Sequence, residues 1–306
     1  MTGSVEEVFQ EAGCTGQLCV QTLDGSREVA LDADRPVVSA SVVKVSIALT
    51  AETQMADGRL DPRRRVLLPA GPDRSPGPVG FALYEDDVEV SARDLTVAML
   101  TLSDNPATDA LLDLVGVDAV NEHIAGLGLT GSVVVADEAA IVDSIGRDAG
   151  FAGWRDLIAW LEAPHPRPEK DAVAERVYAN ATALVPELTT RTTARETATL
   201  LRLIWTDEAG PAPACARVRT LMARQLTRHR LAAGFASPVT VAAKSGGLIG
   251  VVRNEVGVIS FPEEKYVAAV FTQTPGGAEA GADDRAVNAA IGRAAAVAVG
   301  ELREGR

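Results

Sequence analysis

The chain has 306 residues, of which 47% are hydrophobic and 23% are charged, an ordinary composition for a soluble globular protein of one large or two modest domains. Its formal net charge of −13 argues against nucleic acid as a partner, because a phosphate backbone requires a basic surface. The three cysteines are too few for a disulfide framework and indicate a reducing compartment.

The first residues lack the basic patch and apolar core of a signal peptide, and no run of about 18 apolar residues predicts a membrane span. We therefore expect a cytoplasmic protein with no membrane partner; a secreted protein whose leader has been removed is the alternative. The three histidines are not spaced like a metal-binding pair, and no glycine-rich nucleotide fingerprint opens a helix. Neither a metal nor another cofactor is expected.

The first predicted elements are a helix, a hairpin and a second helix. An Asp24-Gly25 turn between two short apolar runs is typical of a hairpin, and Gly58 is a typical helix stop. In chain order, the predictions up to residue 125 are a helix at 4–12, strands at 17–22 and 27–31, a helix that carries Lys44 and ends at Gly58, a loop at 61–80, and helices from Ser91 to about Leu102, from Asn105 to Gly116 and at 118–125.

The rest of the chain predicts more helices and then a sheet. Residues 131–190 are weakly patterned, with an extended piece at 133–135, a helix at 154–161 and a proline-rich loop at 163–168. The later predictions are helices at 193–205 and 218–231, strands at 239–243, 251–260 and 266–274, a turn at 262–265, and a closing helix from about residue 282 to 302.

Strands thus lie at both ends of the sequence, with helices between them. The simplest architecture is an α/β (α+β) fold in which one antiparallel sheet is built from both ends and flanked by the terminal helices, with an all-helical domain inserted. The predicted boundaries are a discontinuous sheet domain at 1–38 and 218–306 and a helical domain at 39–217. We expect a ligand site where the two meet.

Ser41 and Lys44 lie three residues apart at a predicted helix start, so their side chains share one face. A serine becomes a nucleophile when a neighbour takes its proton, and a lysine can do so when burial lowers its pKa. Only four of the 29 lysines and arginines are lysines, and arginine cannot act as a base. Taken alone, the pair also fits a helix-capping serine followed by a surface lysine.

Two more motifs complete a set. Ser103-Asp104-Asn105 lies in a predicted loop between helices, and Lys244-Ser245-Gly246 follows a predicted strand. In this order and spacing, the three motifs resemble those of class A β-lactamases and penicillin-binding proteins, most closely the class A β-lactamases. The likeness covers roughly residues 15–130 and 190–300.

The resemblance implies a β-lactamase-like fold and a role for each matching residue. Ser41 would be the nucleophile, Lys44 its base or part of the proton path, and Ser103, held by Lys244, a proton relay to the leaving group. The substrate's amide side chain would bind Asn105. Its carboxylate would bind Lys244, Ser245 and Arg253, and the backbone N–H groups of Ser41 and Gly247 would form the oxyanion hole.

The chain departs from the family where class A β-lactamases carry a Glu-Pro-x-x-x-Asn loop, whose glutamate activates the water that removes the acyl group. The stretch at the matching distance past Ser103 is 136–140, which contains Glu138 but neither the proline nor the asparagine. Glu138 is the candidate deacylation base; otherwise the usual glutamate is missing. Residues 141–190 exceed the family's loop in length, and we expect them to reshape the site.

Three functions stay open on the sequence. The first is a serine hydrolase that forms a Ser41 acyl-enzyme with a small amide or ester bearing a carboxylate and releases β-lactams slowly. The second is a true β-lactamase with a substitute deacylating group. The third is a degenerate member that binds penicillin or another ligand without turnover. The intact Ser41, Lys44 and Lys244 weigh against the third, and the lost Glu-Pro motif weighs against the second.

Overall fold

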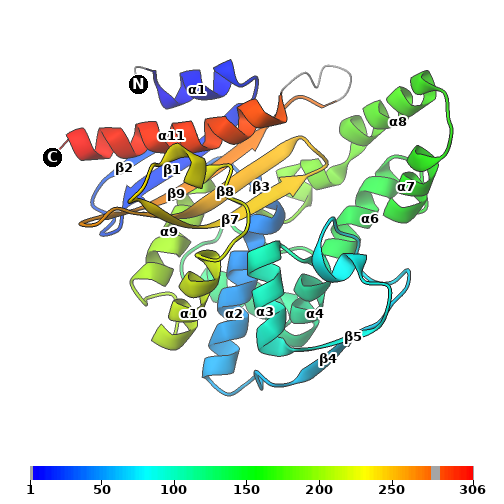
Figure 1. The fold of residues 1–306 in the computed structure, drawn as a ribbon, viewed down its shortest axis with the longest axis horizontal. Helices are drawn as coiled ribbons and strands as arrows, with labels where there is room; N and C mark the ends of the chain where they lie inside the picture. The colour runs from blue at the N-terminus through cyan, green and yellow to red at the C-terminus, as the bar shows by residue number, and fades with distance from the viewer. Residues whose placement is uncertain (1–2, 277–282, 306) are drawn as a thin grey trace.

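The computed structural model describes residues 3–276 and 283–305, and these form three layers (Figure 1). A five-stranded antiparallel sheet lies in the middle. Helices α1 (Val5–Glu11) and α11 (Asp284–Glu304) cover one face of this sheet, and a larger set of helices covers the other. The predicted α/β fold, with one antiparallel sheet built from both ends of the chain and flanked by the terminal helices, is confirmed.

The register of the sheet joins the two ends of the chain. Its strands, in spatial order, are β2 (Glu28–Leu31), β1 (Thr15–Thr22), β9 (Lys265–Gln273), β8 (Val252–Ser260) and β7 (Thr240–Leu248). β1 pairs with β9 along its whole length, from Thr15 opposite Gln273 to Thr22 opposite Tyr266. All of β8 except Ser260 is buried, because helices cover both of its faces. β7 is a free edge, and it carries the Lys244 motif.

Local signals explain the terminal helices. Ser4 Oγ accepts the N–H of Glu7 at 3.2 Å, and Glu7 Oε2 accepts the N–H of Ser4 at 2.8 Å, which is a capping box at the start of α1. Asp283 caps α11 by accepting the N–H of Arg285 at 2.9 Å. The apolar faces of both helices pack with β1, β8 and β9 in one buried cluster that includes Phe9 and Ile291.

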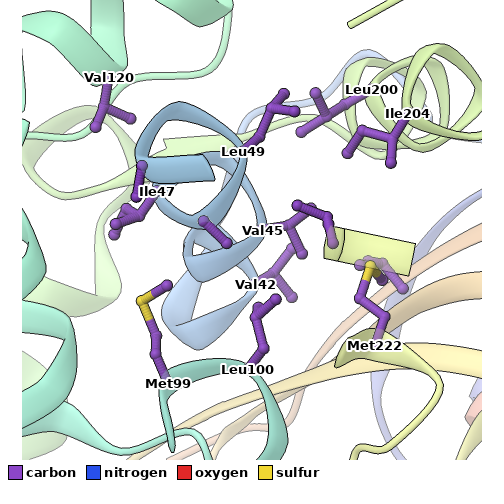
Figure 2. Packing of buried hydrophobic residues seen from close by; sticks show 14 of the residues in the cluster. Val42, Val45, Ile47, Leu49, Met99, Leu100, Val120, Leu200, Ile204 and Met222 are labelled. Atoms are coloured by element: carbon purple, nitrogen blue, oxygen red, sulfur yellow. The ribbon is translucent and has the colours of Figure 1, made fainter. Parts of the chain in front are cut away.

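Helix α2 (Lys44–Ala56) is the centre of the helical side (Figure 2). It is buried continuously from Lys44 to Gln54, and a helix buried on all sides needs other elements around it. Those elements are α3 (Ala92–Leu102), α4 (Asn105–Val115), α5 (Val117–Gly126), α9 (Ala194–Trp205) and α10 (Ala212–Met222). The core around α2 also contains Val256 and Phe271 of the sheet, so helices and sheet share one core. The proposed boundaries at residues 38 and 218 stay a prediction.

Three helices stand apart beside the end of β7: α6 (Glu138–Asp148), α7 (Trp154–Glu162) and α8 (Arg167–Asn180). They have a small core of their own, which includes Ile145, Leu157 and Val173. Leu248 and Ile249, at the tip of the β7–β8 hairpin, pack against this core. Two 3₁₀ turns, η3 (Thr182–Leu184) and η4 (Pro186–Leu188), then lead to β6 (Arg191–Thr192), which pairs with β3 (Val37–Val38).

Several element predictions were wrong in detail. The loop predicted at 61–80 contains β4 (Arg65–Leu68), which pairs with β5 (Val88–Ser91) in a sheet too short to show a sequence period. The helix predicted at 218–231 corresponds to α10, which begins directly after Pro211 and ends at Met222. Residues 231–234 form only the 3₁₀ turn η5 (Leu231–Gly234). Residues 167–180, where no helix was predicted, form α8. The predicted start of the last helix, residue 282, lies outside the described residues.

Two more corrections concern the motifs themselves. Ser41 does not lie in an α-helix but in the 3₁₀ turn η1 (Ala40–Val43), and α2 begins only at Lys44. The cap of α4 is Asp104, whose Oδ1 accepts the N–H of Ala107 at 2.7 Å, and Asn105 is the first residue inside the helix. In both places a helix begins within a few residues of its predicted first residue, and shifts of this size are common at helix ends.

Candidate active site

Ser41 lies at a constrained turn between the sheet and α2. The preceding residue, Ala40, has a φ of 46°, a left-handed conformation that is strained for a residue with a Cβ. Asn254 of β8 holds the turn, because its Nδ2 donates to the carbonyl oxygen of Ser39 at 3.2 Å. Gly246 of β7 packs on the same turn: a Cβ there would lie 3.3 Å from Ser41 N. Two strands therefore fix the backbone of Ser41.

Lys44 is fully buried, and its ammonium group joins three segments of the chain. Its Nζ donates to Ser103 O at 2.9 Å and to Asn105 Oδ1 at 2.7 Å, and it lies 3.4 Å from Glu138 Oε1. Ser103 Oγ is also 3.4 Å from this nitrogen. Such partners are required because an unpaired buried charge is very costly. Lys44 thus connects the Ser103 loop and α6 to the turn of Ser41.

Lys244 is the second fully buried cation of the site. Its Nζ donates to Ser103 Oγ at 2.9 Å and to Ser245 O at 2.7 Å. Burial, together with the positive charge of Lys44, holds the pKa of Lys244 well below its ordinary value. Ser103 itself has a left-handed φ of 65°. Its hydroxyl group lies between the Nζ atoms of Lys44 and Lys244, a position from which it can pass a proton.

Asn105 and Asp104 face in different directions at the start of α4. Asn105 lines the cleft described below, and its Nδ2 donates to Pro76 O at 2.8 Å, which holds the loop around Pro76 against the site. Asp104 is buried, and its Oδ2 accepts the N–H of Phe81 at 2.6 Å. Asp104 therefore anchors this loop, whereas Asn105, like Ser103, lines the cleft.

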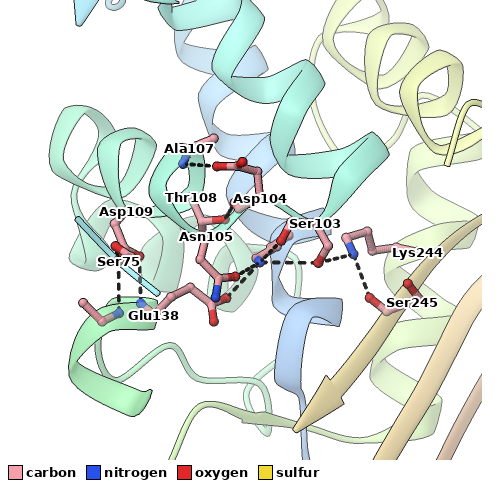
Figure 3. A network of polar contacts seen from close by, with 12 residues as sticks. Ser75, Ser103, Asp104, Asn105, Ala107, Thr108, Asp109, Glu138, Lys244 and Ser245 are labelled. Atoms are coloured by element: carbon pink, nitrogen blue, oxygen red, sulfur yellow. Dashed lines mark hydrogen bonds and ion pairs between the residues drawn. The ribbon is translucent and has the colours of Figure 1, made fainter. Parts of the chain in front are cut away.

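Glu138, the first residue of α6, is held by Asp109 of α4 (Figure 3). Asp109 Oδ1 accepts the N–H of Glu138 at 2.7 Å, and Oδ2 accepts the N–H of Ala139 at 3.1 Å. Burial raises the pKa of Asp109 to about 7, although the hydroxyl of Ser75 and the N–H of Glu138 act in the opposite direction. The structure thus brings Glu138 beside Lys44 in the absence of the Glu-Pro motif.

A cleft of about 640 Å³ opens over these groups, between the edge of β7, the loop around Pro76 and the helices α6 and α7. Ser41, Ser103, Asn105 and Glu138 are among its lining residues. A small cavity of about 30 Å³ adjoins it and is lined in part by Ser41, Glu138 and Thr190. This volume is enough for a water molecule, and the site offers it polar partners.

The free edge of β7 is directed at Ser41. Ser245 N–H donates off this edge to Gln225 Oε1, and N–H groups two residues apart on a strand point the same way. The N–H of Gly247 therefore also points off the edge, and Gly247 and Ser41 both line the cleft. This geometry agrees with an oxyanion hole formed by the two N–H groups.

Arg253 does not lie in the cleft, where the family resemblance predicted that it would bind a substrate carboxylate. Its guanidinium binds Asp284 of α11 and the carbonyl oxygen of Gly250, and it does not line the cleft. The arginine that does line the cleft is Arg230, whose Nη1 donates to Gly246 O at 2.7 Å. The position of Arg253 therefore gives no support to its assignment as a carboxylate-binding residue.

Sequence reasoning missed four residues that shape the site: Asn254, Gln225, Asp109 and Arg230. Gln225 links Ser245 to the buried Glu255, whose Oε1 accepts from Gln225 Nε2 at 2.9 Å. The run 253–255 held a usable signal, because polar residues within an otherwise apolar strand require buried partners. Arg230 gave no such signal, because it lies near the end of the helix predicted at 218–231, where an arginine is an ordinary surface residue.

The fold is that of class A β-lactamases and related penicillin-binding proteins. A β-lactamase from Sphaerobacter thermophilus superposes with a TM-score of 0.73 at 24% identity, covering 97% of each chain. A single-residue mutant of PBP-A, solved as an acyl-enzyme complex with penicillin G, has a TM-score of 0.72 at 21% identity, covering 97% of this chain and 95% of that one.

The chain belongs to the Beta-lactamase enzyme family, whose model matches residues 2–302. A curated relative is the β-lactamase regulatory protein BlaB of Streptomyces cacaoi, which is 28% identical over 308 residues and covers 91% of both chains. Within the described ranges, no helix combines the length and the apolar character that a membrane span needs.

Proposed function

We propose that the protein is a serine hydrolase that forms an acyl-enzyme on Ser41 with a small amide or ester bearing a carboxylate, and that Glu138 activates the water that releases the acyl group. The observation that carries this proposal is the placement of Glu138 Oε1 3.4 Å from Lys44 Nζ, beside a small cavity that both Ser41 and Glu138 line. The site then holds a nucleophile, Ser41, a proton acceptor, Lys44, and a second base, the carboxylate of Glu138.

In the acylation step, Ser41 Oγ attacks the substrate's carbonyl carbon while its proton passes to Lys44. The bond from the carbonyl carbon to the leaving nitrogen or oxygen then breaks. The leaving group takes its proton from Ser103 Oγ, which is replenished from Lys44 at 3.4 Å.

In the deacylation step, a water in the small cavity gives a proton to Glu138 and attacks the acyl carbon. Glu138 passes this proton to Lys44, 3.4 Å away, and Ser41 Oγ departs with the proton that Lys44 then gives up. The Glu-Pro motif is not needed for this step if α6 holds Glu138 in place, as its two backbone contacts with Asp109 do. Release of the acyl group should therefore be faster than the sequence alone predicts.

The decisive variant is Glu138→Gln. It keeps the size of the side chain but removes the base, so penicillin should still acylate Ser41 while the lifetime of the acyl-enzyme lengthens by about 10²–10⁴-fold. Intact-protein mass spectrometry over time after mixing measures this lifetime. The control is Glu162→Gln at the exposed end of α7. Equal lifetimes in wild type and Glu138→Gln would exclude Glu138 as the deacylating base.

A second candidate function is a binding protein that is acylated once, and the observation that favours it is that the relative BlaB is a β-lactamase regulatory protein. The same time course separates the two functions. A wild-type acyl-enzyme that persists for hours, and that Glu138→Gln does not prolong, supports the binding protein. Repeated turnover of a penicillin or an ester supports the hydrolase.

We also propose that Arg230 binds the substrate's carboxylate. Its Nη2 lies 4.0 Å from the position of a Cβ built on Gly247, so the guanidinium is next to the cleft edge of β7. Arg230→Ala should lower kcat/KM for a carboxylate substrate about 10–100-fold more than for its methyl ester, because a charge-assisted hydrogen bond is lost. Arg253→Ala is the matched control and should affect both substrates equally. If only Arg253→Ala discriminates between them, the assignment to Arg230 is wrong.

A further inference from the structure

The part of the cleft formed by α6 and α7 is apolar. From α6 it is lined by Val142 and Ile145, and from α7 by Trp154 and Ile158. Leu248, at the end of β7, closes one side of it. The charged residues among the cleft's lining are Glu138 and Arg230, which lie beside Lys44 and Gly246. A charged substituent placed against α7 would therefore lose its water without gaining a partner.

This apolar wall is built as a rigid surface. The helices α6, α7 and α8 pack around their own core, and Trp154 N–H at the start of α7 donates to Asp143 Oδ1 of α6 at 3.0 Å. The side chains of Trp154 and Ile158 are nevertheless only partly buried. Part of their surface is free to be covered by a ligand that enters the cleft, and a preformed site binds without the cost of ordering its walls.

The position of the proposed proton relay indicates which part of a substrate would lie against the apolar wall of α6 and α7. In the proposed mechanism the leaving group takes its proton from Ser103 Oγ, which accepts from Lys244 of β7, and Arg230 donates to Gly246 of the same strand. Glu138 is the first residue of α6, so the wall begins where the acyl group of an acyl-enzyme is attacked by water. The acyl part of the substrate therefore points toward α7.

Resting on the proposed function, we propose that the substrates are esters or amides whose acyl group ends in a bulky apolar substituent, aryl or medium-chain alkyl, that packs against Trp154 and Ile158. The carboxylate belongs to the leaving part. A short acyl group such as acetyl fills none of this space, whereas a phenylacetyl group reaches it and covers the exposed faces of both side chains.

The test compares two esters of 3-hydroxybenzoate, which carry the same carboxylate-bearing leaving group but an acetyl or a phenylacetyl acyl group. Wild-type kcat/KM for release of 3-hydroxybenzoate should favour phenylacetyl by about tenfold or more. Trp154→Ala should lower this ratio severalfold. The matched control is Trp160→Ala on the same helix, whose ring stacks on His165 at 4.0 Å and does not line the cleft, and this variant should keep the wild-type ratio.

A second variant, Ile158→Asp, covers the case in which Trp154→Ala fails to fold, and it should lower the ratio at least as far because it places a charge in the wall. Acylation of Ser41 by each ester is followed by intact-protein mass spectrometry. If both esters acylate Ser41 with equal kcat/KM, or if the ratio is unchanged in both variants, the apolar acyl site is wrong while the hydrolase stands. If neither ester nor a penicillin acylates Ser41, the proposed function is wrong, and so is this inference, which rests on it.

Discussion

Ser41→Ala should remove covalent labelling completely and lower hydrolysis by about 10⁶-fold, the scale seen when the nucleophile of a serine hydrolase is deleted. The reason is chemical: Ser41 Oγ forms the covalent bond of the proposed acyl-enzyme, and the groups that contact one another beside it, Lys44, Ser103 and Lys244, cannot replace that bond. A fluorophosphonate probe or a penicillin should add its mass to the wild-type peptide that contains Ser41 and to no peptide of the variant.

The control for this experiment is Ser46→Ala. Ser46 lies on the same helix as Lys44 but does not line the cleft, so its loss should leave labelling at the wild-type rate. Thermal unfolding of both variants verifies that they are folded. Undiminished labelling of Ser41→Ala would show that another residue is the nucleophile.

Lys44→Arg should be nearly as inactive as Lys44→Ala, with both losing about 10²–10⁴-fold in the rate of Ser41 acylation. Guanidinium keeps the positive charge that Glu138, 3.4 Å away, requires, but it cannot accept the proton of Ser41. The alanine variant differs in another respect, since it leaves Glu138 without its buried partner, so it should also be the less stable of the two. Stopped-flow acylation and thermal unfolding separate the two effects.

The matched control here is Lys170→Arg on α8, a lysine whose ammonium group contacts the carbonyl oxygen of Leu161 and which does not line the cleft. It should acylate at the wild-type rate. An arginine at position 44 that acylates within a few-fold of wild type would show that Lys44 holds charge and position rather than taking a proton.

The elements that the sequence predicted well are those whose signals are local. The hairpin around Asp24-Gly25, the helix ended by Gly58 and the last two strands follow from turn residues and from regular hydrophobic spacing. β4 and α8 were not predicted because their sequences lack such local signals. β4 is short and lies among prolines, and α8 is mostly polar and has only Val173 and Val177 fully buried.

The sequence by itself determined the order of the elements, the family resemblance and the candidate residues Ser41, Lys44, Ser103 and Lys244, because these rest on short motifs and nearby spacing. Only the tertiary structure decided how they meet. Ser103 and Lys244 are 141 positions apart and in contact, and Asp109, 29 positions before Glu138, brings that glutamate to the site. The tertiary structure also decided that Arg230, not Arg253, reaches the cleft. Both arginines are near β7 in the fold, but a contact with Asp284 of α11 turns Arg253 away, and no local pattern encodes a contact between such distant segments.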